Sequence, residues 1–251
     1  EIIKEAKSLG IEIKFSHVVV AAKGYKKVKS CDIAEISKDK QNLNQIKNIE
    51  CDCICVSGFW TPTVHLASQS GGKTKFKEEI DAFVPDKSKQ KEVTLGSANG
   101  VFTLEETLKT SFDKGFELSK AITNNNNSQQ IPKVSEKKHS KHDKFWCVPL
   151  PKGKKYKRFL DFQNDVAVSD IELAIREGYR SIEHVKRYTT LGMATDQGKT
   201  SNLNGLQLVS NIENKVVPAV GHTTFRPPYT PVSIGAIVGR EIGKHSKPTR
   251  K

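Results

Sequence analysis

The sequence predicts an α/β protein, in which a sheet-forming first half precedes a small helix-turn-helix module and an extended tail. Three observations support this fold class. Short apolar stretches that suit strands recur in the first half, at 11–25, 26–37 and 51–59. A glycine-rich turn at 96–100 leads into an amphipathic helical pattern. From Ser169 onward, apolar residues recur at helical spacing.

Length and composition describe a chain with a polar surface and room for a core. It has 251 residues, 36% of them hydrophobic, which is enough for one large or two small domains. No apolar run approaches the ~20 residues that span a bilayer, so we expect no membrane segment. The chain has neither an initiator methionine nor a signal-peptide pattern, and Glu1 begins inside a helical pattern closed by Gly10. We therefore expect a piece of a longer protein.

The net charge of +13 raises the question of a nucleic-acid partner. Much of the excess is lysine spread over helix faces and linkers, and not arginine interleaved with aromatic residues on a strand. A lysine-rich proteome or an acidic protein partner explains such a charge as well. Nucleic-acid binding is therefore not the leading interpretation.

Five cysteines are present: Cys31, Cys51, Cys53, Cys55 and Cys147. Three of them alternate in CDCICVSG, which predicts that they share one face of a strand. Three cysteines on one face of a strand could bind zinc, but the sequence has no second cysteine pair or histidine cluster at the spacing that would complete four ligands. We expect no metal site and interpret these cysteines as buried free thiols of a core strand. Free thiols suit a reducing compartment, and the cytoplasm is the predicted location.

The strands of the first half are expected in 11–25 and 26–37, whereas 39–50 is polar enough to be interpreted as a turn. The stretch 51–59 is the strongest strand signal of this half, because it is short, apolar and closed by a glycine. In open α/β sheets, ligands bind beyond the carboxyl ends of the strands, which here points to the segment 60–76.

The turn GSANG at 96–100 is a second candidate for ligand binding. A short strand from AFVPD and KEVTL is expected to lead into it, and a helix begins at Thr103 with a capping box to Glu106. This order places backbone N–H groups where a phosphate or a dinucleotide can bind. A tight turn without a ligand explains the same residues. No GxGxxG fingerprint occurs in the chain, so the usual pyrophosphate motif is missing or precedes Glu1.

Two stretches are expected to lack regular structure. Residues 123–144 are polar and of low complexity, and we interpret them as a linker. Its histidines, His139 and His142, are expected to be solvated and not to bind a metal, because no further ligands lie close by. The tail at 216–240 is rich in proline, shows no helical period and is interpreted as an extended connector.

Helices are expected in the module that follows the linker. The first has a capping box from Ser169 to Glu172 and stops at Gly178. The second is capped by Ser181, and a third is expected from about Thr200.

The stretch KRYTTLGMATDQGKTSN at 186–202 lies between the second and third helices and is unusually polar. It contains three cations, five hydroxyl groups on tyrosine and threonine, and two glycines. Several hydrogen-bond donors immediately before the start of a helix can form an anion-binding site. A well-capped turn between helices is the alternative interpretation.

Several stretches together resemble a known family. FLDFQNDVAVSDIELAIREGYRSIEHVKRYTTLGMATDQGKTSN and GHTTFRPPYTPVSIGAIVGR resemble the middle of the alpha subunit of heterotetrameric sarcosine oxidase. SGFWTPTVHLASQSGGK and GSANGVFTLEETL resemble the end of that subunit's dinucleotide-binding portion. The resemblance covers about residues 10–120 and 145–245.

The resemblance implies an enzyme that oxidatively demethylates sarcosine to glycine with O2, forming H2O2 and 5,10-methylenetetrahydrofolate. It implies beta, gamma and delta subunits as partners, with FAD in beta, FMN at the alpha–beta interface, NAD in alpha, and tetrahydrofolate bound elsewhere in the complex. The amine is oxidised in beta, so no catalytic residue is expected in this chain, and this piece alone is expected to be inactive. The alternatives are an oxidase subunit for another N-methyl amine, such as dimethylglycine, and a non-enzymatic basic binding module.

By this resemblance the chain divides into four parts. Residues 1–122 are the C-terminal part of a Rossmann-like NAD-binding domain, and 123–144 are a linker rich in lysine and asparagine. Residues 145–213 are a helical module, and 214–251 are an extended connector toward an absent aminomethyltransferase-like folate domain.

The helical module is also similar to a small [2Fe–2S] domain of ferredoxin-like proteins. Aligned on GMATDQGKTS, its four cysteine positions are Asp161, Gln163, Asp196 and Ser201. A cluster needs thiolate ligands, so none is expected here. The loop is expected to serve an FMN phosphate or a subunit interface instead.

Two sets of cofactor-binding residues are implied. The set for NAD is Ser97, Ala98, Phe102 and Leu104. The leading set for the FMN phosphate, which combines a cation with hydroxyl and N–H groups at a helix start, is Lys199, Thr200, Ser201 and Asn202.

A second group near the flavin is Lys186, Arg187 and Thr190, because a cation near a flavin stabilises its anionic reduced form. Ordinary interfacial salt bridges are the alternative for the two cations. Trp60 and His65 are interpreted as core and surface residues of the sheet.

Overall fold

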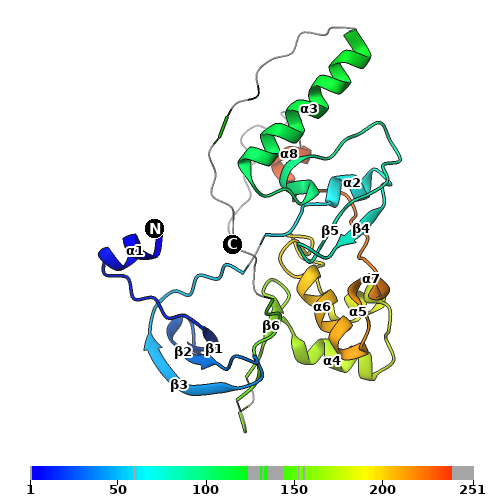
Figure 1. Cartoon of the computed structure of the whole chain (residues 1–251). Helices are drawn as coiled ribbons and strands as arrows, with labels where there is room; N and C mark the ends of the chain where they lie inside the picture. The colour runs from blue at the N-terminus through cyan, green and yellow to red at the C-terminus, as the bar shows by residue number, and fades with distance from the viewer. Residues whose placement is uncertain are drawn as a thin grey trace. The chain divides into compact units, whose positions relative to one another are not determined.

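The chain divides into two compact units (Figure 1). The first contains 1–59, 142–159 and 167–169, and the second contains 60–141, 160–166 and 170–251. The computed structural model describes residues 2–58, 60–123, 131, 133–134, 144–151, 153–154 and 156–238. The linker histidines, His139 and His142, and most of 123–144 lie outside these residues.

The first unit is built on an antiparallel sheet of three strands in the order β1-β2-β3. A short helix, α1 (Ile2–Ser8), precedes β1 (His17–Gly24), β2 (Val28–Ile36) and β3 (Leu43–Glu50). Short turns join consecutive strands, so each strand pairs with its neighbour in the sequence. The strands expected in 11–25 and 26–37 are confirmed as β1 and β2.

The third strand is not where the sequence predicted it. Residues 39–50, interpreted as a turn, contain β3, whereas 51–58 form neither helix nor strand. Polar residues suit β3 because most of its side chains are exposed at the edge of the sheet. The apolar run after it lacks a pairing partner, and Val56 is 76% exposed. The predicted core strand of cysteines is therefore wrong: Cys53 and Cys55 are exposed.

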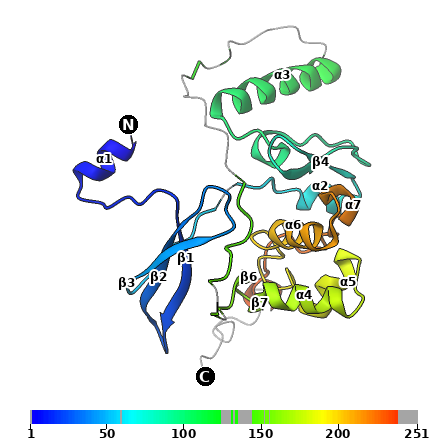
Figure 2. The same ribbon diagram turned by 60° about the horizontal axis from the view of Figure 1, so that its bottom comes forward.

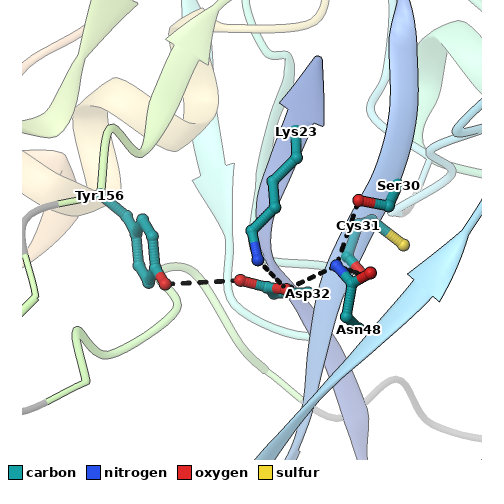
Figure 3. Close-up of polar contacts among 6 residues, drawn as sticks. All are labelled: Lys23, Ser30, Cys31, Asp32, Asn48 and Tyr156. Carbon is teal, nitrogen blue, oxygen red and sulfur yellow. Dashed lines mark hydrogen bonds and ion pairs between the residues drawn. The ribbon is translucent and has the colours of Figure 1, made fainter.

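The centre of the sheet contains a buried carboxylate, Asp32, which is 2% exposed. The ammonium of Lys23 on β1 lies 2.7 Å from one oxygen, and the amide nitrogen of Asn48 on β3 donates to the same oxygen at 2.9 Å. The hydroxyl of Tyr156 donates to the other oxygen at 3.4 Å (Figure 3). Because Lys23, Asp32 and Asn48 lie on β1, β2 and β3, these contacts join the three strands of the sheet. The hydrogen bonds from Lys23 and Asn48 also lower the pKa of Asp32.

The second unit begins with α2 (His65–Gln69) and a hairpin of β4 (Thr74–Lys77) and β5 (Ala82–Pro85). A 3-10 turn, η1 (Gly96–Asn99), and the helix α3 (Leu104–Thr123) follow. The predicted strand at AFVPD and the helix from Thr103 are confirmed, but KEVTL is not a strand. A Cβ on Gly100, whose φ is +75°, would lie 2.6 Å from Ile80 Cδ1, so this turn requires glycine.

The helical part of the second unit contains the expected helix-turn-helix pattern. After β6 (Phe159–Asp161) and β7 (Val166–Ala167) come α4 (Val168–Arg176), α5 (Ile182–Thr189) and α6 (Asn202–Glu213). The helices α4, α5 and α6 lie together in both views of the ribbon (Figure 2). Their apolar faces form a core whose fully buried members include Ile171, Val185, Leu191, Leu206 and Val209.

Several end signals of these helices differ from prediction. The helix α4 already begins at Val168, so Ser169 lies inside it and the predicted capping box is wrong. Ser181 and Ser201 do occupy N-cap positions, but neither side chain makes a capping hydrogen bond. The tail is not wholly extended, because it contains α7 (Val217–Val220) and α8 (Ile234–Val238).

The mixed α/β class is confirmed, but the arrangement of the strands differs from an open parallel sheet. The pairs β1–β2, β2–β3 and β4–β5 are all antiparallel. The expectation that a ligand lies beyond parallel carboxyl ends therefore has no counterpart in these strands. Within the described residues, no helix has both the length and the apolar character needed to cross a bilayer.

Candidate functional site

The turn between α5 and α6 wraps around the side chain of Asn202. Thr190, Gly192, Gln197 and Gly198 all have positive φ angles, between 51° and 73°. A Cβ on Gly192 or on Gly198 would lie 2.1–2.2 Å from atoms of the Asn202 amide. The two glycines are therefore required by a close approach and not only by their backbone conformation.

Oxygen groups occupy the positions that resemble cluster cysteines, and they bind the chain itself. Asp161 is 2% exposed, and its carboxylate accepts from the backbone N–H of Gly192 at 2.8 Å. Its other oxygen accepts from the N–H groups of Gln163 and Asn164 at 2.9 and 3.1 Å. The side-chain oxygen of Gln163 accepts from the hydroxyl of Thr195 at 2.9 Å. These acceptors join the β6–β7 turn to the 190–202 turn.

A second carboxylate, Asp196, satisfies the donors before α6. It accepts from the N–H of Gly198 at 3.1 Å and from the hydroxyl of Thr200 at 2.7 Å. Burial raises the pKa of Asp196, but the hydrogen bonds from Thr200 and Gly198 outweigh burial and lower it. The backbone N–H groups of the predicted anion-binding set already have internal acceptors: that of Thr200 donates to the Asp196 carboxylate, and those of Lys199, Ser201 and Asn202 donate to backbone carbonyls.

The leading FMN set is turned toward the protein. The ammonium of Lys199 donates to the carbonyl of Tyr229 at 2.8 Å and lies 4.4 Å from the centre of its ring. Ser201 is fully buried, and Asn202 is 6% exposed and donates to the hydroxyl of Thr223 at 3.2 Å. Lys199 and Thr200 contact internal partners, although Thr200 is exposed.

A cavity of about 240 Å³ lies beside these residues and contains an excess of positive charge. Lys186 and Arg187 on α5 line it together with Arg226 from the tail, and Glu183 supplies a single carboxylate. Its remaining lining residues are Gly192, Met193, Ala194, Gln197, Thr224, Phe225 and Pro227. Three cations face one carboxylate, so the cavity retains positive charge that suits an anionic ligand.

The carboxylate of Glu183 already has two partners. Arg187 lies 3.3 Å from Glu183, one helical turn away, and the backbone N–H of Thr224 donates to Glu183 at 2.8 Å.

Burial lowers the pKa of Lys186, and the neighbouring Arg226 and Arg187 lower it further. A half-buried ammonium that is disfavoured in this way gains stability when an anion binds.

The position of Arg226 depends on contacts between the tail and the 186–202 turn. The amide of Gln197 donates to the carbonyl of Pro228, and Lys199 binds Tyr229 as described. Reasoning from the sequence missed Arg226 and Glu183. The only local signal was FRPPY, an arginine between an aromatic residue and two prolines in a segment interpreted as a connector.

The third residue of the second group, Thr190, does not line the cavity. It is the C-cap of α5 with φ +63°, and its carbonyl accepts from the side-chain amide of Asn164 at 2.9 Å. Its role in the structure is to end the helix.

A smaller cavity of about 40 Å³ lies on the other side of the turn, lined by His65, His222, Asn202 and Lys199 among others. His65 is 3% exposed and packs against Phe225, with ring centres 3.7 Å apart and ring planes tilted by 38°. Burial lowers the pKa of His65, and burial together with the nearby His65 lowers the pKa of His222 to about 4. Both imidazoles are neutral at pH 7, and the space holds about one water molecule. His65 is a core residue.

The NAD set lies at the start of α3. Ser97 and Ala98 belong to η1, and Phe102 and Leu104 follow within one helical turn. Ser97 and Leu104 are exposed, whereas Ala98 and Phe102 are half-buried. None of the four lines either cavity described above. Within the described residues, no group of three or more histidine, cysteine, aspartate or glutamate side chains is arranged to hold a metal ion.

Comparison with known proteins identifies the region of the cationic cavity. Residues 155–240 match the family model described as the sarcosine oxidase A3 domain, and every residue that lines the cavity lies within them. Sarcosine oxidase subunit alpha of Rhizobium meliloti (strain 1021) is 37% identical over 240 residues, which is 93% of this chain and 23% of that protein. The same subunit of Corynebacterium sp. (strain P-1) is 32% identical over 253 residues, 98% of this chain and 26% of that protein.

Among solved structures, the L-proline dehydrogenase from P. horikoshii is similar in fold. The TM-score is 0.60 at 19% identity, and the match covers 94% of this chain and 47% of that chain. At this identity the likeness concerns the fold alone. The sequence relatives are the more informative, and the chain spans about a quarter of their length. The resemblance expected from the sequence is confirmed: this chain is similar, over nearly all of its length, to a part of the sarcosine oxidase alpha subunit.

Proposed function

We propose that this chain is part of the alpha subunit of a heterotetrameric sarcosine oxidase and holds the phosphate of FMN at the interface with the beta subunit. The whole enzyme demethylates sarcosine to glycine with O2 and forms H2O2 and 5,10-methylenetetrahydrofolate. The observation that carries the proposal is the cationic cavity of Lys186, Arg187 and Arg226, which lies entirely within the matched A3 domain.

The size of the cavity supports a phosphate and not a whole flavin. Sites that enclose a complete drug-sized ligand have volumes of about 300–1,000 Å³. A volume of about 240 Å³ accommodates a phosphate and part of the attached chain. The isoalloxazine ring would then lie against another subunit, as expected for a cofactor shared between alpha and beta.

The residues fit the group in charge as well as in volume. A phosphate dianion neutralises cations that the single carboxylate Glu183 leaves unbalanced. Arg187 and Arg226 offer forked N–H donors, and Lys186 offers a point charge. A bound flavin would supply redox chemistry. This chain contributes binding and electrostatics, and no residue of it is assigned a catalytic role.

The test is the FMN content of the assembled complex. The chain, extended to the full alpha subunit, is co-expressed with its beta, gamma and delta partners, and after removal of free flavin the bound FMN is quantified separately from the FAD. The double variant Lys186→Ala/Arg226→Ala is expected to retain less than a tenth of the FMN. The matched control Lys75→Ala, which removes an exposed lysine on β4, is expected to retain all of it. Unchanged FMN in the double variant with an intact complex refutes the assignment.

The same experiment weighs the alternative residue set. If FMN is lost from Lys199→Ala/Thr200→Ala and not from Lys186→Ala/Arg226→Ala, the phosphate binds at the start of α6. NAD binding at Ser97, Ala98, Phe102 and Leu104 is a separate part of the proposal, and a Ser97→Tyr variant that still retains NAD contradicts it.

The substrate and the alternatives are distinguished by the assembled enzyme. FAD-dependent oxidation of dimethylglycine in place of sarcosine identifies another N-methyl amine as the substrate. A chain that never joins a flavoprotein and binds RNA with a steep salt dependence is a basic binding module, for which the net charge of +13 is the motivating observation.

A further inference from the structure

Two exposed cysteines follow the last strand of the first unit. The hydrogen-bond ladder between β2 and β3 ends where the backbone N–H of Cys51 donates to the carbonyl of Lys29 at 3.2 Å. Residues 52–58 then form neither helix nor strand. In this segment the sulfur atoms of Cys53 and Cys55 lie 3.9 Å apart, and both residues are exposed.

We propose that Cys53 and Cys55 are a reversible modification site, a dithiol that closes to a disulfide by exchange with a small disulfide such as oxidised glutathione. Residues i and i+2 of an extended segment point to the same side, which explains why the two sulfur atoms are close. A disulfide bond is about 2.05 Å long, so the sulfur atoms approach by about 2 Å on closure. Rotation of two exposed side chains on a segment outside any ladder provides this movement.

The exchange proceeds in two balanced steps. One cysteine thiolate attacks a sulfur of oxidised glutathione, so that a mixed disulfide forms and one glutathione thiolate leaves. The second cysteine thiolate attacks the cysteine sulfur of the mixed disulfide, which closes the Cys53–Cys55 bond and releases the second glutathione. The two cysteines lose two protons, which the two glutathione thiolates take up. The dithiol is oxidised, and one glutathione disulfide is reduced.

The other described cysteines differ in access. Cys31 is 7% exposed on β2, and burial raises the pKa of its thiol. Cys147 is half-buried, and the guanidinium of Arg158 donates to its sulfur at 3.1 Å.

The hydrogen bond with the Cys55 thiol raises the pKa of Cys53, so the exchange is expected to become faster as the pH rises from 7 to 9.

The site lies at a boundary in the chain. The chain first passes from the first unit to the second between residues 59 and 60, and Cys53 and Cys55 lie a few residues before this crossing. A closed ring in this segment restricts its backbone torsions. Oxidation therefore stiffens the segment 53–55, which lies outside the three-stranded sheet.

The test is a titration of the full chain with glutathione buffers of graded oxidation, followed by acid quenching, alkylation and peptide mapping by mass spectrometry. The expected product is a peptide that contains both Cys53 and Cys55, is two hydrogens lighter and is not alkylated. Its fraction should follow the ratio of glutathione disulfide to the square of glutathione. The control Cys147→Ser should titrate as the unmodified chain does.

The variant Cys53→Ser separates the two steps. This variant retains only one thiol of the pair, so we expect it to accumulate a stable glutathione adduct on Cys55. In the original chain, Cys53 attacks this adduct and forms the disulfide. Persistent adducts on both cysteines of the original chain overturn the proposal. So does a disulfide that joins Cys51 to Cys31, or the absence of oxidation at every ratio.

Discussion

The carboxylate of Asp161 accepts a hydrogen bond from the backbone N–H of Gly192 at 2.8 Å, in the interior of the second unit. This bond joins the β6–β7 turn to the turn that precedes α6. Two further N–H groups, those of Gln163 and Asn164, donate to the same side chain. One buried carboxylate therefore satisfies three backbone donors that have no helical or strand partner.

Replacement of this carboxylate should destabilise the second unit. Asp161→Ala leaves the buried N–H of Gly192 without an acceptor, which costs about 1–3 kcal/mol, whereas water can reach the N–H groups of the exposed residues Gln163 and Asn164. We expect the free energy of unfolding to fall by about 1–3 kcal/mol, measured by urea titration with circular dichroism. The control Asp165→Asn changes an exposed side chain in the same turn and should alter stability by less than about 0.5 kcal/mol. Equal effects of the two variants would mean that the Asp161 bonds contribute little.

The close approach between Gly198 and Asn202 predicts a measurable coupling. Gly198→Ala introduces a Cβ that would lie 2.2 Å from the Asn202 amide, at a φ of +73°. We expect a loss of about 3 kcal/mol, of which about 1 is backbone strain and about 2 is overpacking. Asn202→Ala in the same chain removes the clash, so the double variant should lose about 2 kcal/mol less than the sum of the single variants.

Gly178 provides a matched control for this cycle. Its φ is +98°, but a Cβ there would have nothing within 4 Å. Gly178→Ala should therefore cost only the strain of about 1 kcal/mol and show no coupling to Asn202→Ala. A similar loss from Gly178→Ala and Gly198→Ala would contradict the steric explanation.

The stability of the first unit should depend on pH through Asp32. Its pKa is lowered in the folded state by hydrogen bonds from Lys23 and Asn48, so the carboxylate stabilises the unit above its unfolded pKa of about 4. This contribution is lost as the pH falls below about 4 and through the folded pKa. In a Trp60→Phe background, the fluorescence of Trp146 reports unfolding of this unit. Asp32→Asn should lower its stability at pH 7 by about 2 kcal/mol and flatten the acid dependence.

The stability of the second unit should depend on pH in a higher range through His222. Its pKa is lowered to about 4, first by burial and then by the nearby His65. The unfolded chain takes up a proton near pH 6.5, whereas the folded chain does so only near its lowered pKa. The free energy of unfolding should therefore decrease between pH 6.5 and 4, by at most about 3 kcal/mol from this residue.

His222→Phe tests this origin because phenylalanine retains an aromatic ring beside Phe83 and Phe225. The variant should show a shallower decrease of stability between pH 6.5 and 4, determined by urea titration at each pH. A profile identical to that of the original chain would assign the dependence to other groups, of which His65 is the first candidate.

Local sequence patterns predicted the helices α3 to α6 well, but they missed α2 and the tail helices α7 and α8, and they predicted the third strand of the first unit poorly. The helices α5 and α6 begin within two residues of the predicted caps, because helical periodicity and start signals are contained in a short window. β3 has polar residues and pairs with β2, and this pairing is not visible in its own residues. The stretch 51–59 has the apolar alternation of a strand but pairs with no other strand along its described residues, so the prediction from its own residues was wrong.

The family resemblance, the mixed α/β class and the polar turn at 186–202 could be recognised without a structure, because motifs, composition and periodicity are properties of contiguous residues. Which donors of that turn remain available depends on tertiary contacts. Asp161 and Asp196 already bind its N–H groups. The tail brings Arg226 to Lys186 and Arg187, which moves the excess charge from the start of α6 to the adjacent cavity. Such a site forms only when packing joins segments that are distant in sequence, and no local pattern encodes that distance.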